Sequence, residues 1–301
     1  MEHRPAVSVV IPVFCREGTI ERALASVTAQ TWQDYEILVV DDGSTDRTVA
    51  VVEALGLKQL RLIRHEANRG PAAARNTAIK AARGRWIALL DSDDEWSRDK
   101  LARQLAAMQG VDAKVRGCAT GFRLIRNERS STVRLDYDSA EFRKLILFGC
   151  SVSPGATLLV ERAVFDDVGL FDEDLRRLED WDWLLRFVRR YDLTFVPDAL
   201  ATVYVRFVGS PDQRQAVFEA LRKIRLEHLP QLATMGDRQR LRSSLLIERA
   251  AIAWRRSQMI RAAALTVVAV IIYPLRNRQF FKMLGRSVVS VLGGRHLRAD
   301  K

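Results

Sequence analysis

Short apolar runs alternate with helical patterns along the first part of the chain. Four runs have the β-branched, mostly apolar composition of strands buried on both faces. They are Val7–Val13, Glu36–Val40, Leu60–Arg64 and Arg85–Leu90. Apolar residues recur at helical spacing between them, in Ile20–Val27, Thr45–Leu55 and Pro71–Ala82. Thr19 is placed to cap the first helix. The alternation predicts an α/β fold with a mostly parallel central sheet and helices on both faces.

The pattern is less regular from about residue 111. A strand is predicted over Ala156–Val160, a Trp-rich helix over Asp180–Arg190, and two short strands over Thr194–Val196 and Val203–Phe207. Residues 1–210 are therefore expected to form one domain. Its first half, to residue 110, carries the clearest strand and helix alternation, and residues 111–210 form the second half.

Charge separates the C-terminal region from the rest of the chain. The net charge is +11, but residues 221–301 hold 17 Lys or Arg against 4 Asp or Glu, a net of +13, which leaves residues 1–220 at about −2. Residues 211–301 are thus expected to be a basic helical tail. Such asymmetry favours an anionic partner, a membrane surface or nucleic acid. Because the rest of the chain is not basic, we expect no nucleic acid. The tail 221–301 is interpreted either as a contact with a membrane surface or as a solvated helical face.

One stretch of this tail is strongly apolar. Ala262–Leu275 contains no charged residue, but it is shorter than the roughly 20 residues needed to cross a bilayer. Pro274 and the flanking Arg261 and Arg276 suit a helix that lies in the membrane interface or packs on the domain.

Composition is that of a folded protein in a reducing compartment. The chain is 48% hydrophobic and 28% charged, which argues against disorder. Its three cysteines are far apart, and its four histidines are scattered, so neither a zinc site nor a disulfide framework is indicated. The segment before Val7 is too short for a secretion signal, and we expect a cytoplasmic protein.

An acidic turn follows the fourth predicted strand. In Asp91-Ser92-Asp93-Asp94, three carboxylates within four residues repel one another unless a divalent cation or solvent neutralises them. Mg²⁺ or Mn²⁺ bound there would leave coordination positions for the oxygens of a diphosphate. The alternative is an acidic helix N-terminus.

A second acidic turn, Asp41–Asp46, follows the second predicted strand. A carboxylate there can accept a hydrogen bond from a nucleobase or a ribose, and Gly43 permits a tight turn. The alternative is an ordinary turn and helix cap. Since ligands of parallel sheets bind at the carboxyl ends of the strands, both turns are expected at one edge.

Five motifs, taken together, resemble the family 2 glycosyltransferases, which have the GT-A fold. They are Val-Ser-Val-Val-Ile-Pro-Val-Phe at 7–14, Ala-Ser-Val-Thr-Ala-Gln-Thr-Trp at 25–32, Val-Val-Asp-Asp-Gly-Ser-Thr-Asp at 39–46, Asn-Arg-Gly-Pro-Ala-Ala-Ala-Arg-Asn at 68–76 and Leu-Asp-Ser-Asp-Asp at 90–94. The resemblance continues more thinly through Ser-Pro-Gly-Ala at 153–156, Phe-Asp-Glu at 171–173 and Leu-Glu-Asp-Trp-Asp-Trp-Leu-Leu-Arg at 178–186. It implies a nucleotide-sugar-binding half over 1–110 and an acceptor half over 111–210.

The resemblance also implies roles in donor binding. Pro12 and Phe14 would border the nucleobase, Asp42 would accept a hydrogen bond from the base or the ribose, and Arg75 would face the diphosphate. Asp91 and Asp93, with Ser92 between them, match the Asp-X-Asp motif of the family. Asp93 is expected to be the direct ligand of Mn²⁺ or Mg²⁺, assisted by Asp91, with Asp94 as a substitute.

Glu179-Asp180 resembles the acidic pair that carries the catalytic base of inverting members. We assign the base to Asp180, with Asp182 as its rival. The base would remove a proton from the acceptor hydroxyl as it attacks the anomeric carbon, in one displacement. The same residues also suit a capped helix in which Trp181, Leu184, Leu185 and Val188 pack inward.

Three departures from the family pattern limit the resemblance. Phe14-Cys15 stands where Tyr-Asn is frequent, and Val203–Phe207 lacks a histidine common near the end of the catalytic domain. The Gln-X-X-Arg-Trp motif of processive synthases is absent, which favours the addition of one sugar per encounter.

The sequence thus predicts an inverting, metal-dependent glycosyltransferase that uses a UDP- or dTDP-sugar. The acceptor would be a glycan or a lipid-linked glycan at the cytoplasmic membrane face, in cell-surface polysaccharide synthesis. One alternative is a non-catalytic protein that binds a glycan or a nucleotide. Another is a sugar-nucleotide nucleotidyltransferase, which would carry a Gly-rich phosphate loop where this chain has Pro12-Val13-Phe14-Cys15.

Overall fold

The computed structural model describes residues 4–127, 129–205 and 211–273, and the chain forms two compact units. Unit 1 comprises Met1–Arg143 and Cys150–Val208, and unit 2 comprises Lys144–Gly149 and Gly209–Lys301. The domain limits predicted from the sequence, and the assignment of donor and acceptor halves, stay predictions.

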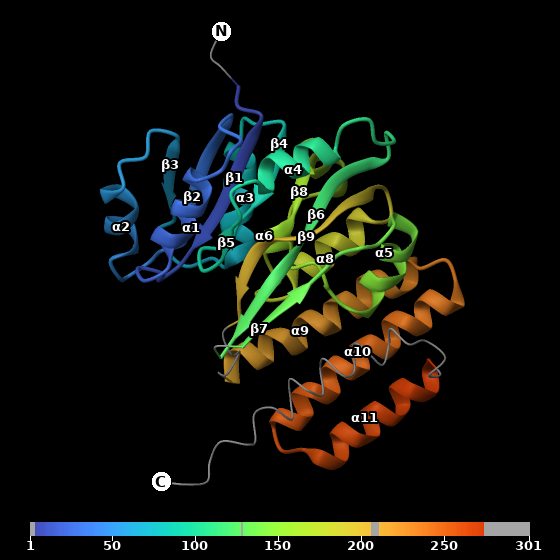
Figure 1. Ribbon diagram of the computed structural model, residues 1–301. Coiled ribbons are helices and arrows are strands. Elements are labelled where there is room, and N and C mark those ends of the chain that lie inside the picture. The colour runs from blue at the N-terminus through green and yellow to red at the C-terminus, as the bar shows by residue number, and fades with distance from the viewer. Residues whose placement is uncertain (1–3, 128, 206–210, 274–301) are drawn as a thin grey trace. The chain divides into compact units, whose positions relative to one another are not determined.

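Unit 1 is built on a nine-stranded mixed sheet in the described part of the chain (Figure 1). Its strand order is β3-β2-β1-β4-β8-β6-β9-β5, and β7 pairs with β6. The strands are β1 Val7–Val13, β2 Tyr35–Asp41, β3 Leu60–Arg64, β4 Trp86–Leu89, β5 Glu95–Trp96, β6 Val115–Arg126, β7 Arg129–Val133, β8 Leu159–Glu161 and β9 Asp192–Tyr204. The pairs β1–β2, β1–β4, β2–β3 and β6–β9 are parallel, whereas β8, β5 and β7 run antiparallel to their partners.

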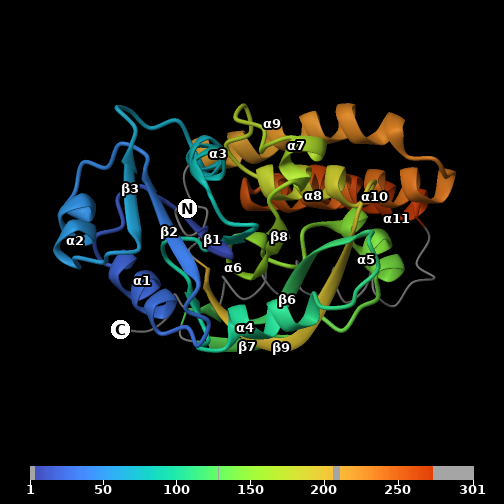
Figure 2. The same cartoon turned by 90° about the horizontal axis from the view of Figure 1, so that it is seen from above.

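Both faces of the central strands are covered. Every residue of β1 and β2 is buried, as expected for strands between two helical layers. Alternate residues of β1 join a core with residues of α1, α2 and α4, while α3 also packs against β1 and β2. Figure 2 shows α1 and α3 on opposite sides of these strands. The predicted α/β arrangement, with helices on both faces of the central strands, is confirmed.

The helices of unit 1 follow the predicted order with shifted ends. They are α1 Ile20–Thr28, α2 Thr48–Ala54, α3 Pro71–Ala81, α4 Lys100–Ala107, α5 Ser139–Leu145, which ends in unit 2, α6 Pro154–Thr157, α7 Val164–Val168 and α8 Glu179–Phe187. Ile20, Ala23, Leu24 and Val27 are buried on one face, as predicted. Thr19 occupies the N-cap position of α1, as predicted, but its side chain makes no capping hydrogen bond.

The second half of unit 1 differs from the prediction in its strands. The two short strands expected over Thr194–Val196 and Val203–Phe207 are joined in one 13-residue strand, β9. Residues 206–207 of that expectation lie outside the described residues. The register of β9 with β6 shifts between two successive pairs. Thr120 of β6 pairs with Val196, whereas the next residue, Gly121, pairs with Ala199. Proline has no backbone N–H to donate to a neighbouring strand, and it is accommodated at such irregularities. Because of Pro197, the sequence predicts two strands where the chain forms one.

A strand predicted over Ala156–Val160 is also wrong in its first half. The chain turns through Ser153, which has a positive φ of 48°, and Pro154 then begins the short helix α6. Pro is favoured in the first turn of a helix because its φ suits that position. The strand β8 begins only at Leu159.

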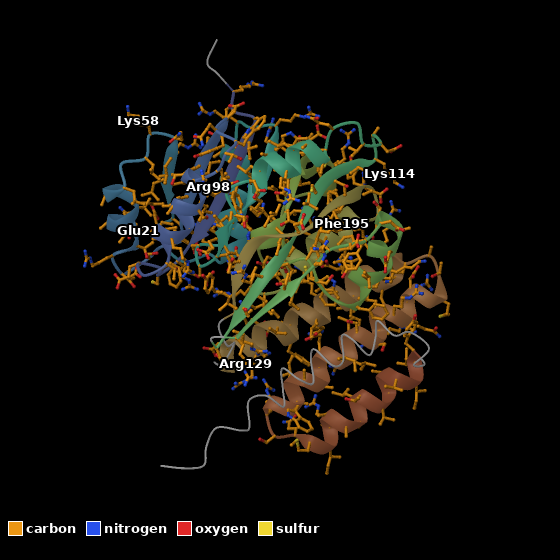
Figure 3. All side chains as sticks on the ribbon, in the orientation of Figure 1. Glu21, Lys58, Arg98, Lys114, Arg129 and Phe195 are labelled. Atoms are coloured by element: carbon orange, nitrogen blue, oxygen red, sulfur yellow. The ribbon has the colours of Figure 1, made fainter. Side chains whose placement is uncertain are left out.

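Aromatic packing supports the second half of the sheet. The residues Trp181, Leu184, Leu185 and Val188 are buried, as predicted. Trp183 stacks on Phe165 with ring centroids 4.9 Å apart. Figure 3 shows Phe195 of β9 near α5, where its ring centroid lies 5.2 Å from that of Phe142.

Unit 2 is helical in its described part. It contains the 3₁₀ helices η1 Ile146–Phe148 and η2 Leu229–Gln231, and the α-helices α9 Pro211–His228, α10 Met235–Arg255 and α11 Met259–Ile272. Ser244 of α10 donates a hydrogen bond to the Phe148 carbonyl at 2.7 Å, and Ser243 donates to Ala269 of α11 at 2.9 Å. No helix in the described residues is both long and apolar enough to span a membrane. Of the apolar stretch Ala262–Leu275, residues 262–272 lie in α11 and Tyr273 follows the helix. Pro274 and Leu275 lie outside the described residues.

Candidate active site

The two acidic turns lie at the same edge of the sheet. Strand β1 pairs in parallel with β2 on one side and with β4 on the other. The turn from Asp41 follows β2, and the turn from Asp91 follows β4. The carboxyl ends of parallel neighbours meet at one edge, where open α/β sheets bind ligands.

Arg75 connects the acidic turn to the first turn of α8. Its Nη2 donates to Asp91 Oδ1 at 2.6 Å, and its Nη1 donates to Glu179 Oε1 at 2.5 Å. The guanidinium is buried, and the ring centroid of Phe171 lies 5.7 Å from it. Glu179 stands 104 residues further along the chain, so only the fold brings this pair together.

The electrostatics of this bridge keep Arg75 charged. Burial alone would lower the pKa of Arg75, but the Asp91 and Glu179 carboxylates raise it well above its usual value. A buried guanidinium between two carboxylates forms charge-assisted hydrogen bonds with fixed geometry. Arg75 links two acidic groups, and its predicted place facing a diphosphate stays a prediction.

Asp180 begins the same helix and has the character of a proton acceptor. It is partly buried, and its Oδ1 accepts the backbone N–H of Trp181 at 2.7 Å. Burial, and then the neighbouring Glu179 carboxylate, raise the pKa of Asp180 to about 6, although Arg75 opposes the shift. A carboxylate with this pKa is ionised at neutral pH and holds a proton more tightly than an exposed aspartate.

Asp182, the rival for the base, is committed to the packing of α8. It is fully buried, and its Oδ2 accepts from Arg186 Nε at 3.0 Å and from Arg186 Nη2 at 2.9 Å. Arg186 also donates to the carbonyls of Val168 and Leu170. This ion pair ties α8 to the segment after α7.

The three carboxylates of the acidic turn differ in exposure. The side chains of Asp91 and Asp93 are 35% and 21% exposed. Asp94 is buried, and its Oδ1 accepts the backbone N–H of Tyr204 at 2.9 Å. Burial, followed by the Asp91 carboxylate, raises the pKa of Asp94 to about 8. Ser92 is buried within the turn.

Two arginines that the sequence did not single out lie at the same turn. Arg16 Nε is 3.5 Å from Asp93 Oδ2. Arg22 Nη2 donates to the Asp93 carbonyl at 2.5 Å, and its guanidinium lies 3.8 Å from the ring centroid of Tyr204. Both come from the loop and helix that follow β1, and no local motif distinguishes them from other surface arginines.

The oxygen donors of the turn fit a hard divalent cation. Mg²⁺ and Mn²⁺ prefer carboxylate oxygens and are commonly held by one or two carboxylates, leaving positions for phosphate. Asp91 and Asp93 offer such oxygens on partly exposed side chains, whereas Asp94 is turned to the Tyr204 backbone. The mutual repulsion that raises the pKa of Asp94 would be relieved by a cation.

Gly155 makes room for Asp91. A Cβ atom built on Gly155 would overlap the Asp91 carboxylate, and the Asp91 N–H donates to the Gly155 carbonyl at 2.5 Å. Ser-Pro-Gly-Ala was noted only as part of a resemblance. The close approach explains why glycine suits this position of α6.

The turn at Asp42 is filled by the chain itself. Its carboxylate accepts the backbone N–H of Gly70 at 2.7 Å and that of Arg69 at 3.0 Å. His65 Nδ1 lies 2.7 Å from Asp42 Oδ1, and His65 Nε2 lies 2.9 Å from Thr77 Oγ1. His65 was given no ligand role, and its contacts are those of a residue that positions Asp42.

Residues at the end of β1 border the same edge. Pro12 is buried within β1, whereas Phe14 is 42% exposed just beyond it. Cys15 has a positive φ of 49°, and its N–H donates to Ser44 Oγ at 2.9 Å. This hydrogen bond joins the loop after β1 to the turn after β2 and leaves the Phe14 ring accessible. The nucleobase contacts of Pro12 and Phe14 stay predictions.

The mixed sheet with an acidic turn at the edge where ligands bind is the arrangement that the motif resemblance predicted. A model of the family Glycosyl transferase family 2 matches residues 8–169, and the chain belongs to that family. The resemblance drawn from the motifs is thereby confirmed.

Relatives with similar sequences carry glycosyltransferase names. Uncharacterized glycosyltransferase RP339 of Rickettsia prowazekii is 32% identical over 203 residues, which are 66% of this chain and 63% of that protein. UDP-Glc:alpha-D-GlcNAc-diphosphoundecaprenol beta-1,3-glucosyltransferase WfgD of Escherichia coli is 43% identical over 102 residues, 34% of this chain and 40% of that protein. The chain thus spans less than two thirds of the length of these relatives.

Solved structures share the fold at low sequence identity. Staphylococcus aureus TarS 1-349 in complex with UDP has a TM-score of 0.68 and 23% identity, covering 98% of this chain and 94% of that one. Mannosyltransferase PcManGT from Pyrobaculum calidifontis, in complex with GDP-Man and Mn²⁺, has a TM-score of 0.62 and 20% identity, covering 96% of this chain and 81% of that one. These likenesses establish the fold.

Proposed function

We propose that the chain is an inverting, metal-dependent glycosyltransferase that moves a sugar from a nucleotide-diphosphate donor to a glycan or lipid-linked acceptor in cell-surface polysaccharide synthesis. The observation that carries the proposal is the buried Arg75, which joins Asp91 of the acidic turn to Glu179 beside Asp180. The Arg75 guanidinium therefore sets the separation between the candidate metal site and the candidate base.

The donor is a UDP- or dTDP-sugar bound across the edge of the sheet. The exposed ring of Phe14 supplies an apolar surface for the nucleobase beside Pro12. Asp42 lies at the same edge, where a contact with the base or the ribose competes with donors from Gly70 and Arg69. The TarS neighbour was solved with UDP, and the E. coli relative is named for a UDP-glucose donor.

Asp93, with Asp91, would hold Mn²⁺ or Mg²⁺. When bound, the cation neutralises charge on the diphosphate as it leaves. Arg75 holds Asp91 in place, and Arg16 lies beside Asp93. Asp94 is the weaker candidate because its carboxylate accepts the Tyr204 N–H.

Asp180 acts as the base. Its carboxylate removes the proton of the acceptor hydroxyl while that oxygen forms a bond to the anomeric carbon and the nucleotide diphosphate departs from the opposite side. The raised pKa of Asp180 suits a group that must take up a proton near neutral pH. Arg75 limits the rise in the pKa of Asp180 and pairs with Glu179. Asp180 is therefore the carboxylate of the two that serves as the base.

The acceptor is expected at a membrane surface on the cytoplasmic side. The excess of positive charge in residues 221–301 supports contact with anionic lipid, because basic segments are attracted to such surfaces.

A panel of nucleotide sugars with and without Mn²⁺ tests the proposal. Specific binding raises the melting temperature by mass action, so the matching donor should stabilise the chain only with the metal present. Turnover of that donor should then release the nucleoside diphosphate. Binding without turnover on any glycan or lipid-linked acceptor would favour a non-catalytic protein. Formation of a nucleotide sugar from a nucleoside triphosphate and a sugar phosphate would favour a nucleotidyltransferase.

A further inference from the structure

A groove lies among the three long helices of unit 2. Helix α10 packs against both α9 and α11, and it lies between them in Figure 1. The cavity has a volume of about 440 Å³. Ten residues line it, and they are Phe218, Leu221, Arg222, Arg225, Arg242, Leu245, Leu246, Arg249, Val268 and Ile272.

The lining divides into two chemical kinds. Six of the ten residues are apolar and come from all three helices, whereas the other four are arginines from α9 and α10. Arg222 and Arg225 are three residues apart, and Arg242 and Arg249 are seven apart, so each pair lies on one helix face. The groove therefore combines an apolar wall with a cluster of guanidinium groups.

The four guanidiniums have no carboxylate partner in the described parts of the chain. Other cationic side chains of the unit have a carboxylate partner. Arg240 pairs with Asp237 at 2.7 Å, and Lys223 lies 4.0 Å from Glu227. Within the groove, the Arg249 guanidinium lies 5.4 Å from the Phe218 ring centroid. Among the residues that the structure describes, the buried Nε of Arg249 has no hydrogen-bond partner, which is costly unless an acceptor arrives.

Helix α11 continues the apolar surface beside the groove. Its 14 residues include one charged residue, Arg261, and only Ala262 and Ala269 are buried. Ile260 and Ile271 are 89% and 70% exposed, and Val268 combines 44% exposure with a place in the groove wall. Large apolar side chains exposed together mark an interaction surface.

We propose that this groove binds an anionic phospholipid of a membrane surface. The arginines take the phosphate, a fatty acyl chain lies against the apolar wall, and the exposed side chains of α11 enter the lipid interface. Charge complementarity selects an anion, and the apolar wall selects one that carries a hydrocarbon chain. The inference rests on the membrane contact in the proposed function and names its residues and its ligand.

Vesicle flotation of the full chain tests the groove. We expect binding to phosphatidylcholine vesicles that contain phosphatidylglycerol, and little binding to phosphatidylcholine alone. The double variant Arg225→Gln/Arg242→Gln should bind about thirtyfold more weakly, as each basic residue at an anionic surface contributes about fivefold. Both side chains are exposed, so the variant should fold.

The matched control is Lys144→Gln/Arg256→Gln. It removes the same charge from exposed positions of unit 2 outside the groove lining. We expect a loss below about threefold, because these side chains would contribute only through the diffuse field. An equal loss in both variants would mean that total charge, not the groove, attracts the vesicle, and would overturn the proposal.

Two further measurements separate the lipid from other ligands. Short-chain phosphatidylglycerol should raise the melting temperature of the parent and of Val268→Ala, with a smaller rise in Val268→Ala. Inorganic phosphate should raise neither. An equal rise with phosphate alone would indicate a free anion site and refute the lipid assignment.

The test is independent of sugar transfer. The groove variant should keep the parental donor-induced stabilisation and the parental turnover with a soluble acceptor. Loss of vesicle binding with donor turnover intact supports the groove assignment, whereas absence of donor binding with vesicle binding intact would refute only the transferase proposal.

Discussion

The two acidic turns of unit 1 share a sequence pattern but have opposite surroundings. Each follows a buried strand of the parallel part of the sheet. The Asp42 side chain is 4% exposed and accepts the backbone N–H groups of Arg69 and Gly70. The Asp91 and Asp93 side chains are 35% and 21% exposed. One turn uses its carboxylate within the fold, and the other presents its carboxylates at the surface of the site.

The source of the difference is the loop that follows β3. It ends at Gly70, just before α3, and aims two N–H groups at Asp42. The turn at Asp93 receives arginine side chains instead, and its carboxylates remain within reach of solvent. The number of backbone donors that reach each turn therefore decides how far its carboxylates are held by the fold or left exposed.

Asp180→Asn should have the largest effect on activity. It removes the proposed base, which is joined to the exposed acidic turn through Glu179 and Arg75. We expect kcat to fall about 1,000-fold, within the range of general base catalysis. Steady-state release of nucleoside diphosphate, with saturating donor and Mn²⁺, provides the measurement.

Asp182→Asn is the control for that assignment. It weakens the ion pair with Arg186 and should lower the melting temperature more than Asp180→Asn does. Parental turnover in Asp180→Asn, together with a folded but inactive Asp182→Asn, would transfer the role of base to Asp182.

Asp42→Ala should have the largest effect on stability. It leaves the partly buried N–H of Arg69, the buried N–H of Gly70 and the ring of His65 without their acceptor. Buried donors that lose a partner cost about 1–3 kcal/mol each, and we expect a net loss of about 3 kcal/mol in the free energy of unfolding. Urea denaturation checks this value. An unchanged unfolding midpoint would show that the carboxylate is not a structural anchor.

Asp93→Asn should show the reverse behaviour. Its side chain is partly exposed, so the free energy of unfolding should change by less than about 0.5 kcal/mol. Turnover should fall about 100-fold, as for the loss of one group that stabilises charge on a reacting centre. Titration with Mn²⁺ should show weaker activation. Parental metal dependence in this variant would remove Asp93 from the metal site.

The sequence predicted the first half of unit 1 better than the second for a local reason. Apolar runs such as Val7–Val13 are buried on both faces, and their pattern alone is sufficient to identify them. In the second half, Pro197 interrupts the apolar pattern of a strand that continues past it, and Pro154 begins a helix where a strand was expected. These outcomes depend on partners distant in sequence.

The candidate site was predictable in composition but not in connection. The acidic turns and Glu179-Asp180 were identified from strand ends and motifs. The role of Arg75 as a link was not, because its partner Glu179 is 104 residues away. The arginines near Asp93 and the close approach of Asp91 to Gly155 are likewise set by tertiary contacts.

Gly155→Ala tests whether the position of the Asp91 side chain in the exposed acidic turn matters for activity. The added Cβ would overlap the Asp91 carboxylate and push it from Arg75. We expect kcat/KM to fall about tenfold, since small misplacements at an active site are costly. The control Gly18→Ala places a Cβ where no atom lies within 4 Å and should leave kcat/KM unchanged. Parental kcat/KM in Gly155→Ala would show that the Asp91 position does not matter.

Mild acid should produce the smallest effect. Burial and Glu179 raise the pKa of Asp180 to about 6, so kcat/KM should be halved near pH 6 and fall about tenfold per pH unit below it. The residual activity of Asp180→Asn should not show this decrease below pH 6.

The loss should not come from unfolding. A carboxyl group with a raised pKa binds its proton more tightly in the folded state. Its contribution to stability is therefore lost as the pH rises through about 6 and is regained as the pH falls. Lowering the pH from 7 to about 5 should thus reduce kcat/KM while this group adds to the free energy of unfolding. Parallel decline of activity and melting temperature over this range, with the same decrease in Asp180→Asn, would assign the pH dependence to the fold rather than to the base.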